Sequence, residues 1–315
     1  MSETTILADI GGTHARFTLL EKGTIKNPEK RAVNDFPDIE TALRDYAPDC
    51  KNLMIATAAQ PDDKNIWHMA NNDKWVINPD LLKQNGWHLK IIMNDFAASA
   101  RGALADSTLI TLRAGHADDK SPCAIIGPGT GLGLAYMIPL PRKKWHIQQT
   151  CGAHMMATTM TDEQHTITKL TRRLYTDQRI ITFEDVASGR ALPFLYGAVC
   201  MHNGVSPVFE TTQDILGHAD NIQVMQTLRL FHEFLGLFAH NVVVTGHTFG
   251  GLYLDGGITQ RLYKAGLFDM DTFIKFMMPR VTPMVRKRLE AVPIHMVNDP
   301  FVALRGLAEM AKDGA

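Results

Sequence analysis

The sequence predicts an α/β protein built from two lobes with a cleft between them. The chain has 315 residues, which is long for one hydrophobic core, because domains of roughly 100 to 200 residues are the rule. Residues 5–20 and 121–138 each place a glycine-rich turn between two apolar strands. Between these stretches, a strand-like segment ends in Asn94 and Asp95. Two similar hairpins separated by a carboxylate on a strand end indicate two related α/β lobes.

The composition is that of an ordinary globular protein without a charge bias. Hydrophobic residues make up 45% and charged residues 21%, and the formal net charge is -1 at pH 7. Because there is no basic surplus, neither nucleic acid nor a membrane surface is an expected partner. Residues 1–12 lack the basic and apolar stretches of a signal peptide, and the apolar stretch around His240 is too short for the roughly 20 residues of a membrane span. We therefore expect a cytoplasmic protein.

The first hairpin is predicted at residues 5–20, TILADIGGTHARFTLL. Apolar residues alternate on both sides of Gly11 and Gly12, which is the pattern of a strand, a tight turn and a second strand. A dinucleotide-binding Rossmann loop would need a helix after the glycines, whereas ARFTLL reads as a strand. The turn is therefore expected to join two strands.

The segment LKIIMNDFAASARGALA is predicted to be a buried strand, Leu89 to Met93, followed by an alanine-rich helix. Asn94 and Asp95 then lie at the carboxyl end of the strand, where open α/β sheets bind ligands. A simpler interpretation is that one of the two residues only caps the helix, and for an isolated Asn-Asp pair this interpretation is favoured.

The second hairpin, SPCAIIGPGTGLGLAYMI at residues 121–138, repeats the first design. Its glycines alternate and no lysine follows them, so neither the Rossmann nor the P-loop pattern is present. Glycine-rich turns can point their backbone amides at anions. Together with Asp95, the two turns suggest that phosphates are held from opposite sides.

The stretch QQTCGAHMMATT places Cys151 three residues before His154. A metal site would need two more ligands at short spacing, and only Asp162 and Glu163 follow, at the start of a predicted helix. The chain's cysteines show no paired CxxC spacing, and a nucleophile with its base three residues away in a small-residue turn is equally unexpected. The residues by themselves leave the function of this turn open.

Four helices and one strand are further predicted in the second half of the chain. A helix is expected to begin at Thr182, with Asp185 supporting the cap and Glu184 in its first turn. An apolar stripe at helical spacing between residues 224 and 242 predicts a buried helix. A strand, an Asp-Gly-Gly turn and a helix are expected at residues 249–262, and a last helix from about Pro300.

Five motifs in order resemble the bacterial-type glucokinase family, the zinc-free branch of the actin-like, hexokinase-type sugar kinases. DIGGTHARF resembles a first phosphate loop, MNDFAASARGAL a catalytic Asn-Asp segment and GPGTGLG a second phosphate loop. FEDVASG resembles a late segment with a sugar-binding glutamate, and TFGGLYLDGGI a nucleotide loop. A cysteine cluster that binds zinc in a related group is missing.

The resemblance implies a two-lobed actin-like, ribonuclease H-like sugar kinase fold with a cleft between the lobes. The small lobe would comprise residues 1–107 with 300–315, and the large lobe residues 108–299. The small lobe would carry the first phosphate loop and the catalytic aspartate, and the large lobe the other motifs. A homodimer is also implied.

The resemblance further implies transfer of the γ-phosphoryl group of ATP to the 6-hydroxyl of glucose. Asp95 would accept the hydroxyl proton and Asn94 would hold neighbouring hydroxyls. A magnesium ion would travel with the nucleotide and be oriented by Asp9, without a metal site made by the protein alone. The implied nucleotide-binding residues are Asp9, Gly11, Gly12, Thr13, Gly129, Thr130, Gly131, Gly256 and Gly257.

Family members have Glu-Gly-Gly-His where this chain has Cys151, Gly152, Ala153 and His154. The resemblance therefore implies a sugar-binding turn that has lost its carboxylate, with His154 and Glu184 left to bind that end of the sugar. A hydrogen bond to a charged group contributes about 1.5 to 3 kcal/mol, so the loss predicts a roughly ten- to more than a hundredfold weaker sugar complex. His14 and Asp255 are smaller departures from the family pattern.

Two other functions stay open at this point. The change at Cys151 is compatible with a kinase for another hexose or for an amino sugar. A sugar-sensing regulatory protein with little turnover would keep the same fold, although the intact Asp9, Asp95 and Gly129–Gly131 argue against it.

Overall fold

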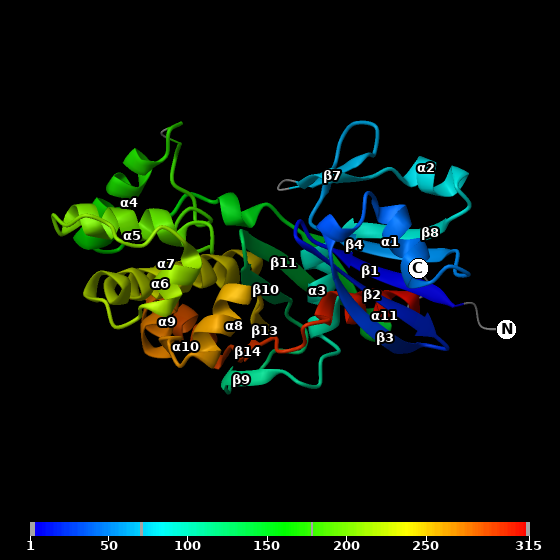
Figure 1. Cartoon of the computed structure of the whole chain (residues 1–315). Helices are drawn as coiled ribbons and strands as arrows, with labels where there is room; N and C mark the ends of the chain where they lie inside the picture. Colours follow the sequence, from blue (N-terminus) through cyan, green and yellow to red (C-terminus); the bar gives the residue numbers. More distant parts are fainter. Residues whose placement is uncertain (1–3, 70–71, 178, 313–315) are drawn as a thin grey trace. The chain divides into compact units, whose positions relative to one another are not determined.

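The computed structural model describes residues 4–69, 72–177 and 179–312, which form two compact units (Figure 1). The first unit comprises the described residues of Met1–Leu109, Leu140–Gln149 and Asp299–Ala315, and the second those of Ile110–Pro139 and Thr150–Asn298. The fold is mixed α/β, as predicted. One difference from the predicted lobes lies at Leu140–Gln149, which groups with the first unit because strand β12 (Lys144–Gln149) packs against helix α3 (Asp95–Ala103).

The first unit is built on a sheet with the strand order β3-β2-β1-β4-β8. Strand β1 pairs antiparallel with β2, and β2 pairs antiparallel with β3, whereas β4 runs parallel to β1 and β8 parallel to β4. The hairpin predicted at residues 5–20 is therefore confirmed. The bounds are β1 Thr5–Ile10, β2 His14–Glu21, β3 Thr24–Ala32, β4 Asn52–Thr57 and β8 His88–Asn94.

The alternation of side chains along β1 divides the first unit into two hydrophobic layers. Ile6, Ala8 and Ile10 belong to a core that includes residues of helix α1 (Ile39–Tyr46). Leu7 points to the opposite face, where helices α3 and α11 (Val302–Lys312) form the second core. Since side chains alternate with a period of two, Asp9 shares the face of Leu7. The last helix, predicted from about Pro300, is confirmed.

Helices α3 and α11 cross where two glycines remove any side chain from the contact. A Cβ atom placed on Gly102 would lie 1.9 Å from the carbonyl oxygen of Val302, and one on Gly306 would lie 1.9 Å from that of Ala98. The backbones of the two helices therefore touch directly. This crossing fixes helix α3, whose first residue is Asp95, against α11.

The rest of the first unit consists of short elements. A small sheet has the order β5-β6-β7, and helix α2 follows it. The bounds are η1 Val33–Asp35, β5 Gln60–Pro61, β6 Trp67–Met69, β7 Asn72–Ile77, α2 Pro79–Gln84 and η2 Pro141–Lys143.

The second unit contains strands in the order β11-β10-β13-β14-β9. Strands β10 and β11 form the second predicted hairpin, and β13 and β14 continue the sheet parallel to β10. This repeats the β2-β1-β4-β8 connection of the first unit: a hairpin whose first strand is extended by two later parallel strands. The bounds are β9 Ile110–Arg113, β10 Cys123–Pro128, β11 Leu132–Leu140, β13 Gly251–Leu254 and β14 Ile294–Met296.

Helices supply most of the core of the second unit. The predicted apolar stripe lies on helix α7, and its six residues Val224, Leu228, Phe231, Leu235, Phe238 and Val242 are all buried. The helix bounds are η3 Gly152–His154, α4 Asp162–Leu174, α5 Leu192–His202, α6 Thr212–Gly217, α7 Ile222–Gly246, α8 Gly257–Lys264, α9 Met270–Met277 and α10 Pro283–Ala291. Among the described residues, no helix is both long and apolar enough to span a membrane.

The prediction that a helix begins at Thr182 is wrong. Thr182 forms an isolated β-bridge with Met156, residues 183–190 form turns and bends, and helix α5 begins only at Leu192. Thr182 and Asp185 do interact, since the backbone N and the Oγ1 of Thr182 both donate to Asp185 Oδ2, at 2.9 and 2.7 Å. The segment does not continue as a helix because the amides of Gly189 and Arg190 donate instead to the carbonyl oxygens of Gly129 and Thr130.

Candidate active site

The strand register of the first unit brings two of the predicted motifs to one edge of its sheet. Ile10 pairs with Thr57, and Thr57 pairs with Asn94, across three parallel strands. The turn that follows Ile10 and the helix that follows Asn94 therefore start from the same carboxyl edge. This is the edge at which open α/β sheets bind ligands.

The first glycine turn is closed by backbone hydrogen bonds. The amide of Gly11 donates to the carbonyl oxygen of His14 at 3.0 Å, and the carbonyl oxygen of Thr13 accepts from Val33 N at 3.0 Å. Thr13 and His14 are exposed at the tip, with Gly12 beside them. The amide of Gly11 is thus used to close the turn, and Thr13 and His14 form its exposed tip.

Asp9 is buried directly below this turn. It lies opposite Arg16 in the antiparallel pair, and Arg16 Nη1 donates to Asp9 Oδ2 at 2.8 Å. Burial raises the pKa of Asp9 above its usual value, and the attraction and hydrogen bond of Arg16 act in the opposite direction. The ion pair therefore favours the carboxylate form in a site that would otherwise disfavour it.

Asn94 and Asp95 begin helix α3. Asn94 Oδ1 accepts from the amides of Phe96 and Ala97, at 3.0 and 3.2 Å, so the capping interpretation is confirmed for Asn94. Asp95 Oδ1 accepts from the amide of Phe96 at 2.7 Å. A carboxylate in the first turn of a helix is stabilised by the helix dipole. The cap leaves the amide nitrogen of Asn94 with the right polarity to donate to a ligand hydroxyl.

In the second unit, backbone hydrogen bonds from a later segment hold the turn at Gly129, Thr130 and Gly131. The amide of Gly129 donates to the carbonyl oxygens of Gly127 and Gly131, at 3.0 and 2.9 Å. The carbonyl oxygens of Gly129 and Thr130 accept from the amides of Gly189 and Arg190, at 2.9 and 3.0 Å. The carbonyl oxygens of Gly129 and Thr130 are thus both hydrogen-bonded to the backbone of residues 189–190.

Glu184 connects this turn to the Cys151–His154 turn. Its Oε2 accepts from the amide of Leu132 at 3.1 Å, directly after the glycine turn. Its own amide donates to the carbonyl oxygen of Ala153 at 3.0 Å. Glu184 therefore lies between the second glycine turn and the turn that contains Cys151 and His154, both of which are exposed. Sequence reasoning named these residues but could not show that they adjoin.

The cysteine-histidine turn is a short 3-10 helix, Gly152–His154, that begins after Cys151. Cys151 is a free cysteine. Within residues 4–69, 72–177 and 179–312, no group of three or more His, Cys, Asp or Glu side chains could hold a metal ion. The turn is thus an exposed surface beside Glu184.

The Asp-Gly-Gly turn lies against the second glycine turn. The strand predicted before it and the helix predicted after it are both confirmed. Asp255 is buried, and its amide donates to the carbonyl oxygen of Ile126 at 2.9 Å. Gly256 has a φ of +102°, and a Cβ atom there would lie 2.5 Å from the carbonyl oxygen of Pro128. Only glycine permits this approach. Helix α8 starts at Gly257.

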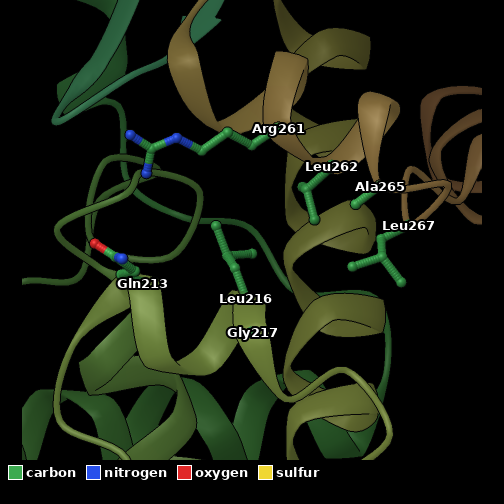
Figure 2. A pocket seen from close by; sticks show the side chains of 7 residues that line it. All are labelled: Gln213, Leu216, Gly217, Arg261, Leu262, Ala265 and Leu267. Atoms are coloured by element: carbon green, nitrogen blue, oxygen red, sulfur yellow. The ribbon is translucent and has the colours of Figure 1, made fainter.

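A cavity of about 350 Å³, which sequence reasoning missed, lies between helices α6 and α8. In Figure 2, Gln213 and Arg261 lie on one side of it and the leucine side chains toward the other. Thr212 Oγ1 donates to the carbonyl oxygen of Gly189 at 2.6 Å, and so joins the start of α6 to the segment that braces the second glycine turn. The lining residues are Gln213, Leu216, Gly217, Arg261, Leu262, Ala265 and Leu267.

The chain is similar to glucokinases in sequence and in structure. The family model described as "Glucokinase" matches residues 6–314. The "Glucokinase" of Agrobacterium fabrum is 29% identical over 323 residues, which cover 98% of this chain and 92% of the relative. The glucokinase structure from an Antarctic psychrotroph has a TM-score of 0.82 at 25% identity and covers both chains completely. A glucokinase of the ROK family from Streptomyces griseus, solved with glucose and AMPPNP, shares the fold with a TM-score of 0.59 at 18% identity, over 99% of this chain and 100% of that chain.

Proposed function

Because the chain belongs to the glucokinase family, we propose that it transfers the γ-phosphoryl group of ATP to the 6-hydroxyl of glucose, giving glucose 6-phosphate and ADP. One observation carries the proposal. The family match runs from residue 6 to residue 314 and so includes both glycine turns, the Asn94–Asp95 segment, the Cys151–His154 turn and the Asp-Gly-Gly turn. The fold is the actin-like sugar kinase fold of the structural relatives, and the likeness to the glucokinase from an Antarctic psychrotroph extends over the whole chain.

Asp95 is the proposed general base. It accepts the proton of the 6-hydroxyl as that oxygen attacks the γ-phosphorus and the bond from phosphorus to the bridging oxygen of ADP breaks. Asn94 stands beside it at the start of α3 and donates to a neighbouring sugar hydroxyl through its amide nitrogen. The other end of the sugar is assigned to the second unit, where Glu184 and His154 bind hydroxyls and Cys151 occupies the remaining position of the turn.

The phosphates are assigned to the two glycine turns. The amides of Gly11 and Gly129 close their own turns, so other backbone amides of the two turns, such as those of Thr13, Thr130 and Gly131, are assigned to stabilise the charge on the phosphate oxygens. The adenosine is assigned to the cavity between α6 and α8, since α8 begins at Gly257 on the Asp-Gly-Gly turn. A cavity of this size fits a small flat ligand, and its leucines supply the apolar surface.

A magnesium ion fits the residues of the first unit. Such an ion keeps several waters and needs only one or two protein carboxylates besides the phosphates, so the buried carboxylate of Asp9 beside the phosphate loop is a suitable partner. The ion would supply positive charge to the phosphate oxygens. Arg16 supports this function by favouring the charged form of Asp9.

The family resemblance also leads us to propose a homodimer that works in the cytoplasm. Light scattering of the purified protein tests the dimer, with a mass of twice 35.0 kDa as the expected result.

A coupled ADP-release assay over a panel of sugars tests the proposed function. The panel contains glucose, mannose, fructose, glucosamine and N-acetylglucosamine, each at several concentrations with ATP and magnesium. We expect the highest kcat/KM with glucose. A higher kcat/KM with another sugar of the panel would make that sugar the preferred substrate. Cys151 would then be the residue that explains the preference. ADP release that does not depend on any sugar would contradict a sugar kinase altogether.

A further inference from the structure

The carboxylate of Glu184 is held at both of its oxygens. Leu132 N donates to Oε2 at 3.1 Å, and Arg190 Nη2 donates to Oε1 at 2.6 Å. The second contact is a charge-assisted hydrogen bond, which is stronger than a neutral one. Glu184 is largely buried, whereas Arg190 reaches it from the surface. The orientation of this carboxylate is thus set by one backbone amide and one guanidinium group.

The main chain of Arg190 is anchored independently of its side chain. Its amide donates to the carbonyl oxygen of Thr130 at 3.0 Å, and the preceding amide, of Gly189, donates to Gly129 at 2.9 Å. The other acidic residue of the segment, Asp185, is engaged elsewhere, because its Oδ2 accepts twice from Thr182. The backbone of Arg190 is therefore hydrogen-bonded to the second glycine turn, and its side chain reaches Glu184.

Stability does not account for this contact. Ion pairs with one exposed partner contribute little to folding, and the side chain of Arg190 is 53% exposed. A second pair has the same exposure of the arginine: Arg286 Nε donates to Glu290 Oε1 at 2.8 Å on helix α10, with 53% of Arg286 exposed. The Arg286 pair lies on a helix surface, whereas the Arg190 pair adjoins the Cys151–His154 turn through Glu184.

We propose that Arg190 is a positioning residue for the sugar, an inference that rests on the proposed function. An ionised carboxylate has about four acceptor sites. Leu132 and Arg190 use one on each oxygen, and the remaining sites accept from sugar hydroxyls in an orientation that is fixed before the sugar binds. Fixing a group in advance increases affinity because less freedom is lost on binding.

The position of Cys151 makes this orientation important in this chain. A cysteine accepts hydrogen bonds weakly, so Glu184 provides the charged acceptor at this end of the sugar site. A rotation of the Glu184 side chain alone would then remove this acceptor from the sugar site. Arg190 thereby sets the affinity for sugar without contacting the phosphates.

The test compares Arg190→Met with Arg190→Lys and with the matched control Arg286→Met. Methionine keeps an unbranched apolar stem and removes the charge and the donors, whereas lysine keeps a point charge. For Arg190→Met we expect the KM for glucose to rise roughly tenfold, the scale of one charge-assisted hydrogen bond, with kcat and the KM for ATP nearly unchanged. Arg190→Lys should recover part of the loss, and Arg286→Met should match the wild type. The thermal midpoint should stay constant in all three variants.

A double-mutant cycle with Glu184→Gln decides whether Arg190 acts through Glu184. In that background, Arg190→Met should change the KM for glucose less than about twofold, because the two effects share one contact. Fully additive losses would overturn the proposal, as would a raised KM for ATP, which would indicate a phosphate contact. An unchanged or lowered KM for glucose in the single variant would overturn it too.

Equilibrium binding separates this proposal from the proposed function. Calorimetric titration of the wild type and of Arg190→Met with glucose measures the sugar site even if phosphoryl transfer is not observed. Weaker binding by Arg190→Met supports the positioning function in either case. Equal binding by the two proteins, or no binding by the wild type, contradicts it.

Discussion

At the scale of single residues, the pairing of Asp9 with Arg16 shows how a buried charge is stabilised beside the first glycine turn. Burial of Asp9 opposes the charged form, and Arg16, its neighbour across the hairpin, favours it. The two residues are separated by the turn that they support. A carboxylate near phosphates is useful only when it is ionised and can attract a cation.

Replacement of Arg16 should therefore change the pH dependence of the reaction. In Arg16→Met the influence that lowers the pKa of Asp9 is lost while burial remains, so the pKa rises further. Asp9 then becomes protonated at a higher pH, and the acidic limb of the kcat/KM profile should move upward. Arg31→Met, which removes an ion pair with Asp45 in the same unit, is the control. An acidic limb that stays in place would show that Asp9 does not act as a carboxylate in the reaction.

Cys151 leads to a second prediction at this scale. If it occupies the place of a sugar-binding glutamate, Cys151→Glu should lower the KM for glucose by about ten- to a hundredfold with little effect on kcat, while Cys151→Ser should do much less. If the natural substrate instead lacks or derivatises the hydroxyl concerned, the same glutamate would worsen its use, because a carboxylate would be left without a partner. Steady-state kinetics over the sugar panel distinguish these results. No effect with any sugar would mean that the turn does not contact the substrate.

At the scale of elements, helix α3 combines a structural and a functional residue at its start. Asn94 caps the helix with its carbonyl oxygen and leaves the amide nitrogen for a ligand. Asn94→Ala should lower the free energy of unfolding by about 1 kcal/mol through loss of the cap. Asn94→Asp keeps a capping oxygen but has no donor, so it should retain stability and still raise the KM for glucose. Equal sugar affinity of Asn94→Asp and the wild type would limit Asn94 to capping.

The elements also show how far the sequence predicts this fold. Both hairpins, the strand before Asn94 and helix α7 follow from local alternation or helical spacing, which the chain itself carries. The helix predicted at Thr182 fails because the amides of Gly189 and Arg190 pair with a turn some sixty residues earlier, at Gly129 and Thr130. Such a partner has no signal in the local pattern.

The candidate site was predictable in its motifs but not in its contacts. The glycine turns, Asp95 and Glu184 belong to recognisable stretches. Arg190 and the cavity between α6 and α8 were missed, because an exposed arginine after Ser-Gly and a few leucines on two short helices look like ordinary surface and core residues. Only the folded arrangement shows that Arg190 reaches Glu184.

At the scale of the whole molecule, the expected sugar ligands are divided between two units that each have their own core. Asn94 and Asp95 belong to the first unit, whereas His154 and Glu184 belong to the second. We propose that one sugar binds both sets, and that its binding closes the units and excludes water from the phosphoryl group. We expect saturating glucose to reduce the radius of gyration in solution scattering. An identical profile with and without glucose would contradict closure.

The proposed mechanism depends on Asp95, which is proposed to accept the proton when phosphate is transferred to glucose. Single-turnover formation of glucose 6-phosphate, followed from preformed enzyme, ATP and magnesium after addition of glucose, tests it most directly for the wild type, for Asp95→Asn and for the control Asp80→Asn on helix α2. Because the base acts on the transition state, Asp95→Asn should slow product formation by several orders of magnitude and leave ATP binding nearly intact, while Asp80→Asn should equal the wild type. A rate for Asp95→Asn within about tenfold of the wild type would show that Asp95 is not the general base.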